Sequence, residues 1–75
     1  MQNHGERLKI LRLERNLLQK DVAEGCGIAI RSIKYYEASE RELSSSVIIK
    51  LCLYFNVSAD YLLGLSNEPR PLRME

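Results

Sequence analysis

The sequence predicts an all-α fold, a compact domain of five short helices. Apolar residues recur at intervals of three and four, which places them on one face of a helix. No segment alternates apolar and polar residues between hairpin turns, so no β-strand is predicted. With 75 residues the chain has room for one small core, which we place in residues 1–66. The polar, proline-containing end at residues 67–75 predicts a flexible tail.

The first helix is predicted over residues 6–16. Leu8 and Leu11 form its inward stripe. Asn16 is expected to end the helix, because asparagine tolerates the left-handed conformation that often follows one. His4 precedes this segment and is expected to lie in a frayed terminus.

The second and third helices are predicted over residues 19–26 and 30–38, on either side of a turn that contains Gly27. Their inward positions are Val22, Ala23, Cys26, Ile33 and Tyr36. The small side chain of Ala23 lets the two helices cross closely, and Gly27 supplies the left-handed residue that a sharp turn needs. Two helices around such a turn form a helix-turn-helix, a motif that places its second helix in the major groove of DNA.

The fourth helix is predicted over residues 45–55 and a short fifth helix over residues 59–63. Ser44 or Ser45 is expected to cap the fourth helix and Ser58 the fifth, because serine side chains accept hydrogen bonds from the free N–H groups there. The inward positions of these helices are Ile48, Leu51, Cys52, Phe55, Tyr61 and Leu62.

The charge and composition narrow the possible functions. A formal net charge of +1 argues against a purely electrostatic nucleic-acid binder, so DNA binding must come from how charges are arranged. No apolar run approaches the roughly 20 residues that a membrane span needs, and the N-terminus lacks the features of a secretory signal. A cytoplasmic location is therefore expected, with Cys26 and Cys52 as reduced core residues.

Catalysis and metal binding find little support in the sequence. His4 is the only histidine and has no acid or nucleophile partner in a predicted helix. No glycine-rich phosphate loop is present, and a metal site would need more ligands than the two cysteines. We therefore expect no enzyme activity and no metal, cofactor or small-molecule ligand.

A recognisable pattern runs from about residue 7 to residue 64. Its first part comprises Leu17, Gln19, Val22, Ala23, Gly27, Ile28, Ile33, Tyr36 and Glu37. Its second part is Phe-Asn-Val-Ser-Ala-Asp-Tyr-Leu-Leu-Gly at residues 55–64. In these positions the chain resembles the XRE/Cro-type helix-turn-helix domains of phage repressors and bacterial regulators. The resemblance implies a lambda-repressor-like fold with the helix-turn-helix at the second and third helices.

The resemblance also implies a DNA-contacting surface around the third helix. Its base-contacting residues would be Ala29, Ile30, Arg31, Lys34 and Tyr35. Gln19 would hold a phosphate beside the N-terminus of the second helix. Arg12 and Glu37 would form a buried ion pair that ties the first helix to the third.

Further phosphate contacts are expected from exposed hydroxyl groups and cations near the motif. These residues are Lys20, Arg41, Ser44, Ser45 and Ser46. Plain helix capping explains the serines nearly as well. Glu40 and Glu42 stand on either side of Arg41 and weaken the attraction of that loop for phosphate.

The side chains of the third helix suit different parts of a base pair. Arg31 has a planar fork that can donate two hydrogen bonds to guanine O6 and N7; the alternative is a solvated surface arginine. Ile30 can meet a thymine methyl group or cover its neighbours. Tyr35 offers a hydroxyl to a base or a phosphate, and Lys34 is expected at a phosphate.

Four positions depart from the family pattern, one of them Leu43, which replaces a common proline. Leu18 and Ala29 stand where a hydroxyl cap is usual, so the second and third helices each lose about 1 kcal/mol of capping. Ser39 replaces a usual glycine, which adds strain if this residue is left-handed.

The sequence thus predicts sequence-specific binding of double-stranded DNA by a transcriptional regulator of the repressor type. A homodimer would read two half-sites roughly 34 Å apart. By resemblance its dimer contact comprises Tyr61, Leu62 and Leu65. The alternative is a protein-interaction module of the same fold, of the antirepressor or antitoxin type, that uses the outward-facing Ile10, Leu13 and Leu53.

Overall fold

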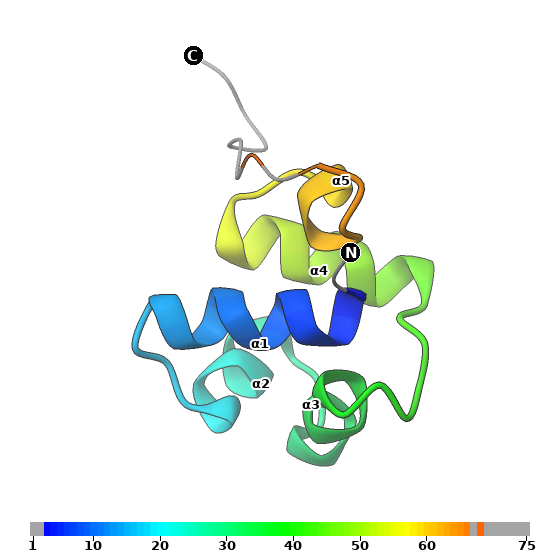
Figure 1. Ribbon diagram of the computed structural model, residues 1–75. Helices are drawn as coiled ribbons and strands as arrows, with labels where there is room; N and C mark the ends of the chain where they lie inside the picture. Colours follow the sequence, from blue (N-terminus) through cyan, green and yellow to red (C-terminus); the bar gives the residue numbers. More distant parts are fainter. Residues whose placement is uncertain (1–2, 67, 69–75) are drawn as a thin grey trace.

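The computed structural model describes residues 3–66 and residue 68. Within these residues the chain forms five helices and no strand, which confirms the predicted all-α fold (Figure 1). The helices are α1 His4–Glu14, α2 Gln19–Cys26, α3 Ile30–Glu37, α4 Ser45–Phe55 and α5 Ala59–Leu62. The flexible tail predicted over residues 67–75 lies outside the described part of the chain, except for Glu68.

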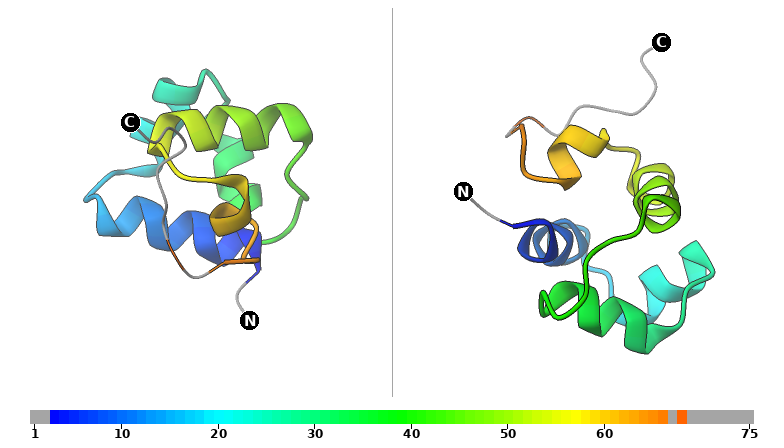
Figure 2. Two further views of the ribbon diagram at one scale, coloured as in Figure 1. Left: turned by 90° about the horizontal axis from the view of Figure 1, so that it is seen from above. Right: turned by 90° about the vertical axis from the view of Figure 1, so that its right-hand side faces the viewer.

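Helix α1 lies between two pairs of helices in the view of Figure 1, on the side of the molecule opposite α4 in the right-hand view of Figure 2. Figures 1 and 2 show α2 and α3 on one side of it and α4 and α5 on the other. Helix α1 packs against α3 and α5, and α2 packs against α3 and α4. The largest fully buried side chains come from all five helices and the α4–α5 loop: Leu8, Leu11, Val22, Ile33, Leu51, Phe55, Val57 and Leu62. One continuous core therefore supports the α2–α3 pair.

Helix α1 begins earlier than predicted, at His4. Asn3 caps it, since its Oδ1 atom accepts a hydrogen bond of 2.8 Å from the backbone N–H of Glu6. The prediction of a frayed terminus at His4 was therefore wrong. At its other end α1 stops at Glu14, and Asn16 adopts the left-handed conformation predicted for it, with φ of 56°.

Two predictions about which side chains point into the core were inaccurate. Val47 takes the buried position at the start of α4, whereas Ile48 is half-buried. Leu13 and Leu53 are exposed as predicted, but Ile10 is half-buried. Helical spacing locates an apolar face only to within a neighbouring position, which accounts for both differences.

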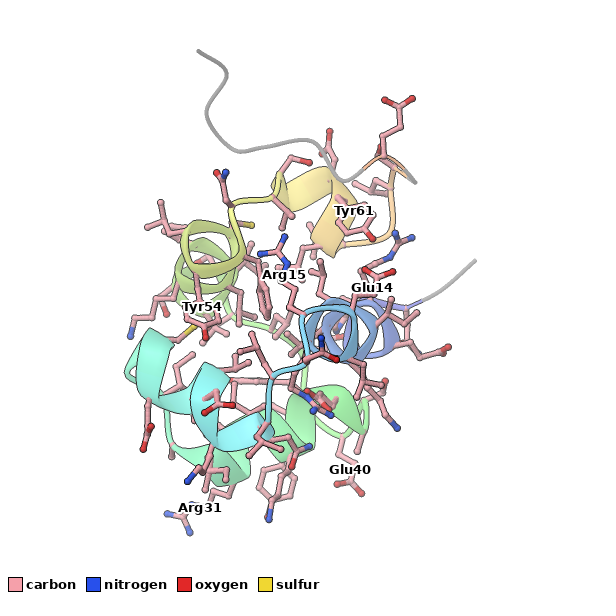
Figure 3. The ribbon with its side chains drawn as sticks, turned by 90° about the vertical axis from the view of Figure 1, so that its left-hand side faces the viewer. Glu14, Arg15, Arg31, Glu40, Tyr54 and Tyr61 are labelled. Atoms are coloured by element: carbon pink, nitrogen blue, oxygen red, sulfur yellow. The ribbon has the colours of Figure 1, made fainter. Side chains whose placement is uncertain are left out.

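Arg7 in α1 and Arg15, which caps its end, stabilise the fold. Arg15 donates from Nη1 to the carbonyl oxygen of Phe55 at 2.6 Å, and its guanidinium lies 5.3 Å from the centre of the Phe55 ring. The guanidinium of Arg7 lies over the ring of Tyr61 at 4.3 Å. Figure 3 shows Arg15 and Tyr61 on the α4–α5 side of the molecule, away from Arg31. These cations therefore join α1 to α4 and α5.

Arg12 and Glu37 form the buried ion pair that the resemblance implied. The Nε atom of Arg12 lies 2.6 Å from Oε2 of Glu37, and Nη2 lies 3.0 Å from Oε1. The third nitrogen, Nη1, donates to the carbonyl oxygen of Leu17 at 2.9 Å. The hydrogen bond to Glu37 raises the pKa of Arg12, against the lowering effect of burial. One guanidinium thus connects α1, the loop that follows it and the end of α3.

The chain turns sharply after α3. Ser39 has φ of 60°, in the left-handed region that favours glycine. Its backbone N–H donates to the carbonyl oxygen of Tyr36 at 3.1 Å, and its hydroxyl donates to Oδ1 of Asn3 at 3.1 Å. Gly5 permits this close approach, because a Cβ atom there would collide with the carbonyl oxygen of Tyr36. The backbone strain predicted for a left-handed Ser39 is therefore present, and the hydrogen bond from its hydroxyl to Asn3 offsets part of it.

Removing one member of the ion pair should destabilise the fold strongly. Arg12→Ala is expected to lower the free energy of unfolding by about 3–5 kcal/mol, because it leaves the carboxylate of Glu37 buried without its cation. Urea unfolding followed by circular dichroism measures this loss. As a control, Lys50→Ala removes an exposed cation from α4 and should change stability by less than about 0.5 kcal/mol. A loss under about 1 kcal/mol for Arg12→Ala would contradict the role given to the pair.

The backbone strain at Ser39 predicts which of two variants is the more stable. Ser39→Ala and Ser39→Gly both delete the hydroxyl, but only glycine relieves the left-handed backbone. Ser39→Gly should therefore be the more stable variant by about 1 kcal/mol in urea unfolding. Equal stabilities of the two variants would mean that the backbone at this position is not strained.

Candidate nucleic-acid interface

The outer face of the α3 segment carries all five residues predicted to contact bases. Ile30 and Tyr35 expose 42% and 40% of their surface. The other three, Ala29, Arg31 and Lys34, are also exposed. The opposite face is buried through Ile33, Tyr36 and Glu37. Figure 3 shows the side chain of Arg31 pointing away from the body of the molecule.

The turn between α2 and α3 directs this face outward. Gly27 has φ of 68°, the left-handed conformation predicted for it. Ala23 is 5% exposed and lies in the core beneath α3. No side-chain hydrogen bond caps either helix at Leu18 or Ala29, as their apolar side chains predict. At the start of α2, Asp21 provides a partial substitute, because its Oδ2 atom accepts the backbone N–H of Leu18 at 2.8 Å.

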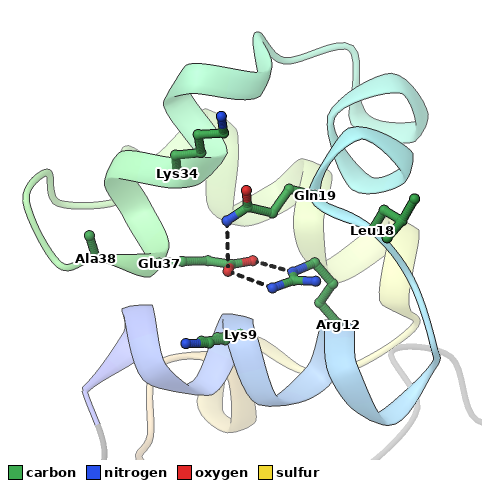
Figure 4. Close-up of a pocket in the computed structure, with 7 residues that line it drawn as sticks. All are labelled: Lys9, Arg12, Leu18, Gln19, Lys34, Glu37 and Ala38. Carbon is green, nitrogen blue, oxygen red and sulfur yellow. Dashed lines mark hydrogen bonds and ion pairs between the residues drawn. The ribbon is translucent and has the colours of Figure 1, made fainter.

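A hollow of about 460 Å³ opens between α1, the start of α2 and α3 (Figure 4). Gln19 lines it and donates from Nε2 to Oε1 of Glu37 at 3.2 Å. Lys9 from α1 and Lys34 from α3 line the same hollow. Because Arg12 balances the charge of Glu37, the two lysines leave the hollow positively charged.

Lys9 was not among the predicted site residues. The sequence held an indication of its place, since Lys9 and Arg12 are about one helical turn apart and so lie on the same side of α1. Together with the implied Arg12–Glu37 pair, this spacing places Lys9 next to α3. Lys34 was predicted both as a residue of the base-contacting face and as a phosphate contact, and its place beside the hollow favours phosphate.

The remaining residues predicted to contact phosphate come from three separate elements. Lys20 lies in α2, Arg41 in the loop after α3, and the three serines at the start of α4; all are exposed. The hydroxyl of Ser44 accepts the backbone N–H of Val47 at 3.3 Å, so Ser44 caps α4. Ser46 hydrogen-bonds the same hydroxyl at 3.2 Å, and the neighbouring Ser45 side chain is exposed.

The predicted dimer contact needs correction. Tyr61 and Leu62 are 6% and 0% exposed and belong to the core that joins α5 to α1 and α4. Their side chains are therefore unavailable to a second copy, and this part of the prediction was wrong. Leu65 is 71% exposed and is the one residue of the three that can form such a contact.

Both cysteines behave as core residues. Cys26 and Cys52 are buried free thiols, and burial raises the pKa of each. Within the described ranges, no group of three or more histidine, cysteine, aspartate or glutamate residues is placed to hold a metal ion. Among the helices of residues 3–66, none has the length and apolar character required to cross a membrane.

Known proteins have sequences similar to this one. Residues 8–62 match a family model described as helix-turn-helix. The chain is 36% identical over 66 residues to YobD of Bacillus subtilis (strain 168), which is named as an uncharacterized HTH-type transcriptional regulator. This alignment covers 88% of this chain and 59% of YobD. It is 38% identical over 60 residues to the HTH-type transcriptional regulator ImmR of the same strain. That alignment covers 80% of this chain and 47% of ImmR. The chain thus spans about half the length of the curated relatives it matches.

A solved structure shares the arrangement of helices. The P22 c2 repressor protein, in complex with synthetic operator 9T in the presence of Tl+, superposes with a TM-score of 0.79 and 28% sequence identity. The superposition covers 84% of this chain and 96% of the repressor chain. The family match extends over both helices of the motif and most of the core that supports them. The chain therefore belongs to the XRE-type helix-turn-helix family.

Proposed function

We propose that this protein binds double-stranded DNA sequence-specifically and regulates transcription as a repressor, with α3 inserted in the major groove. The observation that carries the proposal is the exposed row on α3, which faces solvent while the buried side of the same helix is held by the core and the Arg12–Glu37 pair. The solved P22 c2 repressor supports it, because that relative is a repressor in complex with an operator. Both curated relatives are named as transcriptional regulators.

The exposed row suits direct contact with base edges. Arg31 projects from the first turn of α3, where its guanidinium can donate two hydrogen bonds to one guanine. Ile30 beside it exposes an apolar surface that fits a thymine methyl group. Because α3 spans only about two turns, one copy reads a few base pairs.

The hollow beside α3 suits a phosphate of the DNA backbone. Leu18 and Gln19 at the N-terminus of α2 line it, and Gln19 retains a second amide hydrogen beyond the one given to Glu37. Lys9 and Lys34 add two cations at its walls. Repulsion between a phosphate and the carboxylate of Glu37 is offset by the bidentate contact that Arg12 makes.

Two copies on a palindromic operator would extend the recognised sequence. A two-fold dimer places two recognition helices about 34 Å apart, one turn of B-DNA. Leu65 supplies an exposed apolar side chain close to α5 for such a contact.

A second function is favoured by one observation. Ile49 and Leu53 on α4 expose 60% and 58% of their surface. They border a small apolar cavity of about 170 Å³ together with Ile48, Cys52 and Ala59. An antirepressor or antitoxin of this fold would use such a surface to bind a protein partner.

A salt titration separates these two functions. Affinity for random duplex DNA should fall log-linearly with salt, with a slope of about 0.9 for each phosphate contacted. Fluorescence anisotropy with a labelled duplex measures this slope. If the protein binds no duplex at about 50 mM salt, DNA binding is excluded and the protein-interaction function is left.

The site also predicts that substitutions of Arg31 and Gln19 affect DNA binding in different ways. Arg31→Ala should relax the preference at one base position by about 1–3 kcal/mol, whereas Gln19→Ala should weaken binding to all sequences alike. Affinities for an operator selected from random DNA and for its single-base variants measure the difference. Lys50→Ala is the control, because it removes an equal charge from α4 and should leave base preference unchanged. A uniform loss with Arg31→Ala would rule out base recognition by this arginine.

A further inference from the structure

Arg41 lies against the recognition helix. Its guanidinium carbon is 4.9 Å from the centre of the Tyr35 ring, although the residue belongs to the loop between α3 and α4. The turn at Ser39 makes this contact possible, because its left-handed backbone reverses the chain. A hydrogen bond of 2.9 Å from the N–H of Glu40 to the carbonyl oxygen of Tyr35 closes the turn. Arg41 thus returns to the exposed side of α3.

The immediate neighbours of Arg41 make this placement notable. Glu40 and Glu42 stand on either side of it, and either carboxylate could neutralise the guanidinium. Among the described residues, no ion pair joins Arg41 to either of them. An aromatic ring attracts a cation through its quadrupole and leaves the cation's charge intact. The contact with Tyr35 therefore holds Arg41 on α3 while keeping its charge available to a phosphate.

Arg31 and Arg41 lie at opposite ends of the exposed face of α3. Tyr35 is 40% exposed, so its ring is accessible for a cation to lie on, and Arg41 is exposed beside it. Arg31 lies near the first turn of α3 and Arg41 beyond its last turn. In Figure 3, Arg31 and Glu40 mark these two ends on the same outer side of the molecule. The exposed face of α3 therefore has a cation at each end.

We propose that Tyr35 is a positioning residue whose ring, and not its hydroxyl, holds Arg41 in place to contact a DNA phosphate at the edge of the groove that α3 enters. The inference rests on the proposed DNA-binding function. It assigns Tyr35 a task different from donating its hydroxyl to a base. It also makes the contribution of Arg41 to affinity dependent on an aromatic side chain at position 35.

A double-mutant cycle tests the inference. Four variants are compared with the parent chain on a selected operator: Tyr35→Phe, Tyr35→Ala, Arg41→Ala, and Tyr35→Ala combined with Arg41→Ala. Tyr35→Phe keeps the ring and should bind within about two-fold of the parent, whereas Tyr35→Ala should weaken binding about two- to five-fold. In the Arg41→Ala background, Tyr35→Ala should have almost no further effect. Circular dichroism verifies that each variant is folded.

The salt dependence gives a second readout that a purely structural role would not change. Arg41→Ala should reduce the log-log salt slope by about 0.9, the value for one lost phosphate contact. Tyr35→Ala should also reduce the salt slope, whereas Tyr35→Phe should leave it unchanged. Lys50→Ala is again the matched charge control and should leave the slope unchanged.

The outcomes separate this inference from the function on which it rests. Equal losses with Tyr35→Phe and Tyr35→Ala would show that the hydroxyl acts, and would overturn the inference alone. Additive losses for Tyr35→Ala and Arg41→Ala would do the same. If the parent chain binds no duplex, the proposed function fails and the inference falls with it.

Discussion

The bidentate contact between Arg12 and Glu37 is the interaction on which the presentation of α3 depends. Helix α3 is short, and its buried side packs against both α1 and α2. The guanidinium joins the last turn of α3 to α1 and to the loop before α2. Gln19 adds the start of α2 to the same carboxylate. Loss of either charge would therefore weaken contacts among three helices.

The division of the arginines and lysines between fold and surface accounts for how a nearly neutral chain would attract DNA, as proposed above. Arg7 and Arg15 lie on the rings of α4 and α5, and Arg12 is neutralised by its partner, so these three cations support the fold. The exposed cations near the helix-turn-helix make up the proposed binding face: Lys9, Lys20, Arg31, Lys34 and Arg41. Local arrangement, and not the net charge of +1, governs attraction for phosphate on this account.

Helix periodicity and stop residues were sufficient to predict the five helices, because Gly27 and Asn16 act locally, whereas the lambda-repressor-like arrangement was implied by the resemblance. The early start of α1 was missed although Asn3 and Glu6 have the spacing of a capping pair. The contact of Arg41 with Tyr35 could not be predicted, since it depends on how the loop after α3 folds back against the helix. The spacing of Lys9 and Arg12 on α1 did indicate the place of Lys9, but it was not used. The error at Tyr61 arose because a resemblance was preferred to the apolar spacing that placed this residue in the core.

Chemical footprinting with dimethyl sulfate tests the central claim most directly, because the reagent methylates guanine N7 in the major groove and adenine N3 in the minor groove. On a selected operator, the account predicts protection of guanine N7 in each half-site, with protection of one guanine lost when Arg31 is replaced by alanine. Protection of adenine N3 alone, or unchanged reactivity of N7 at saturating protein, would contradict the insertion of α3 into the major groove.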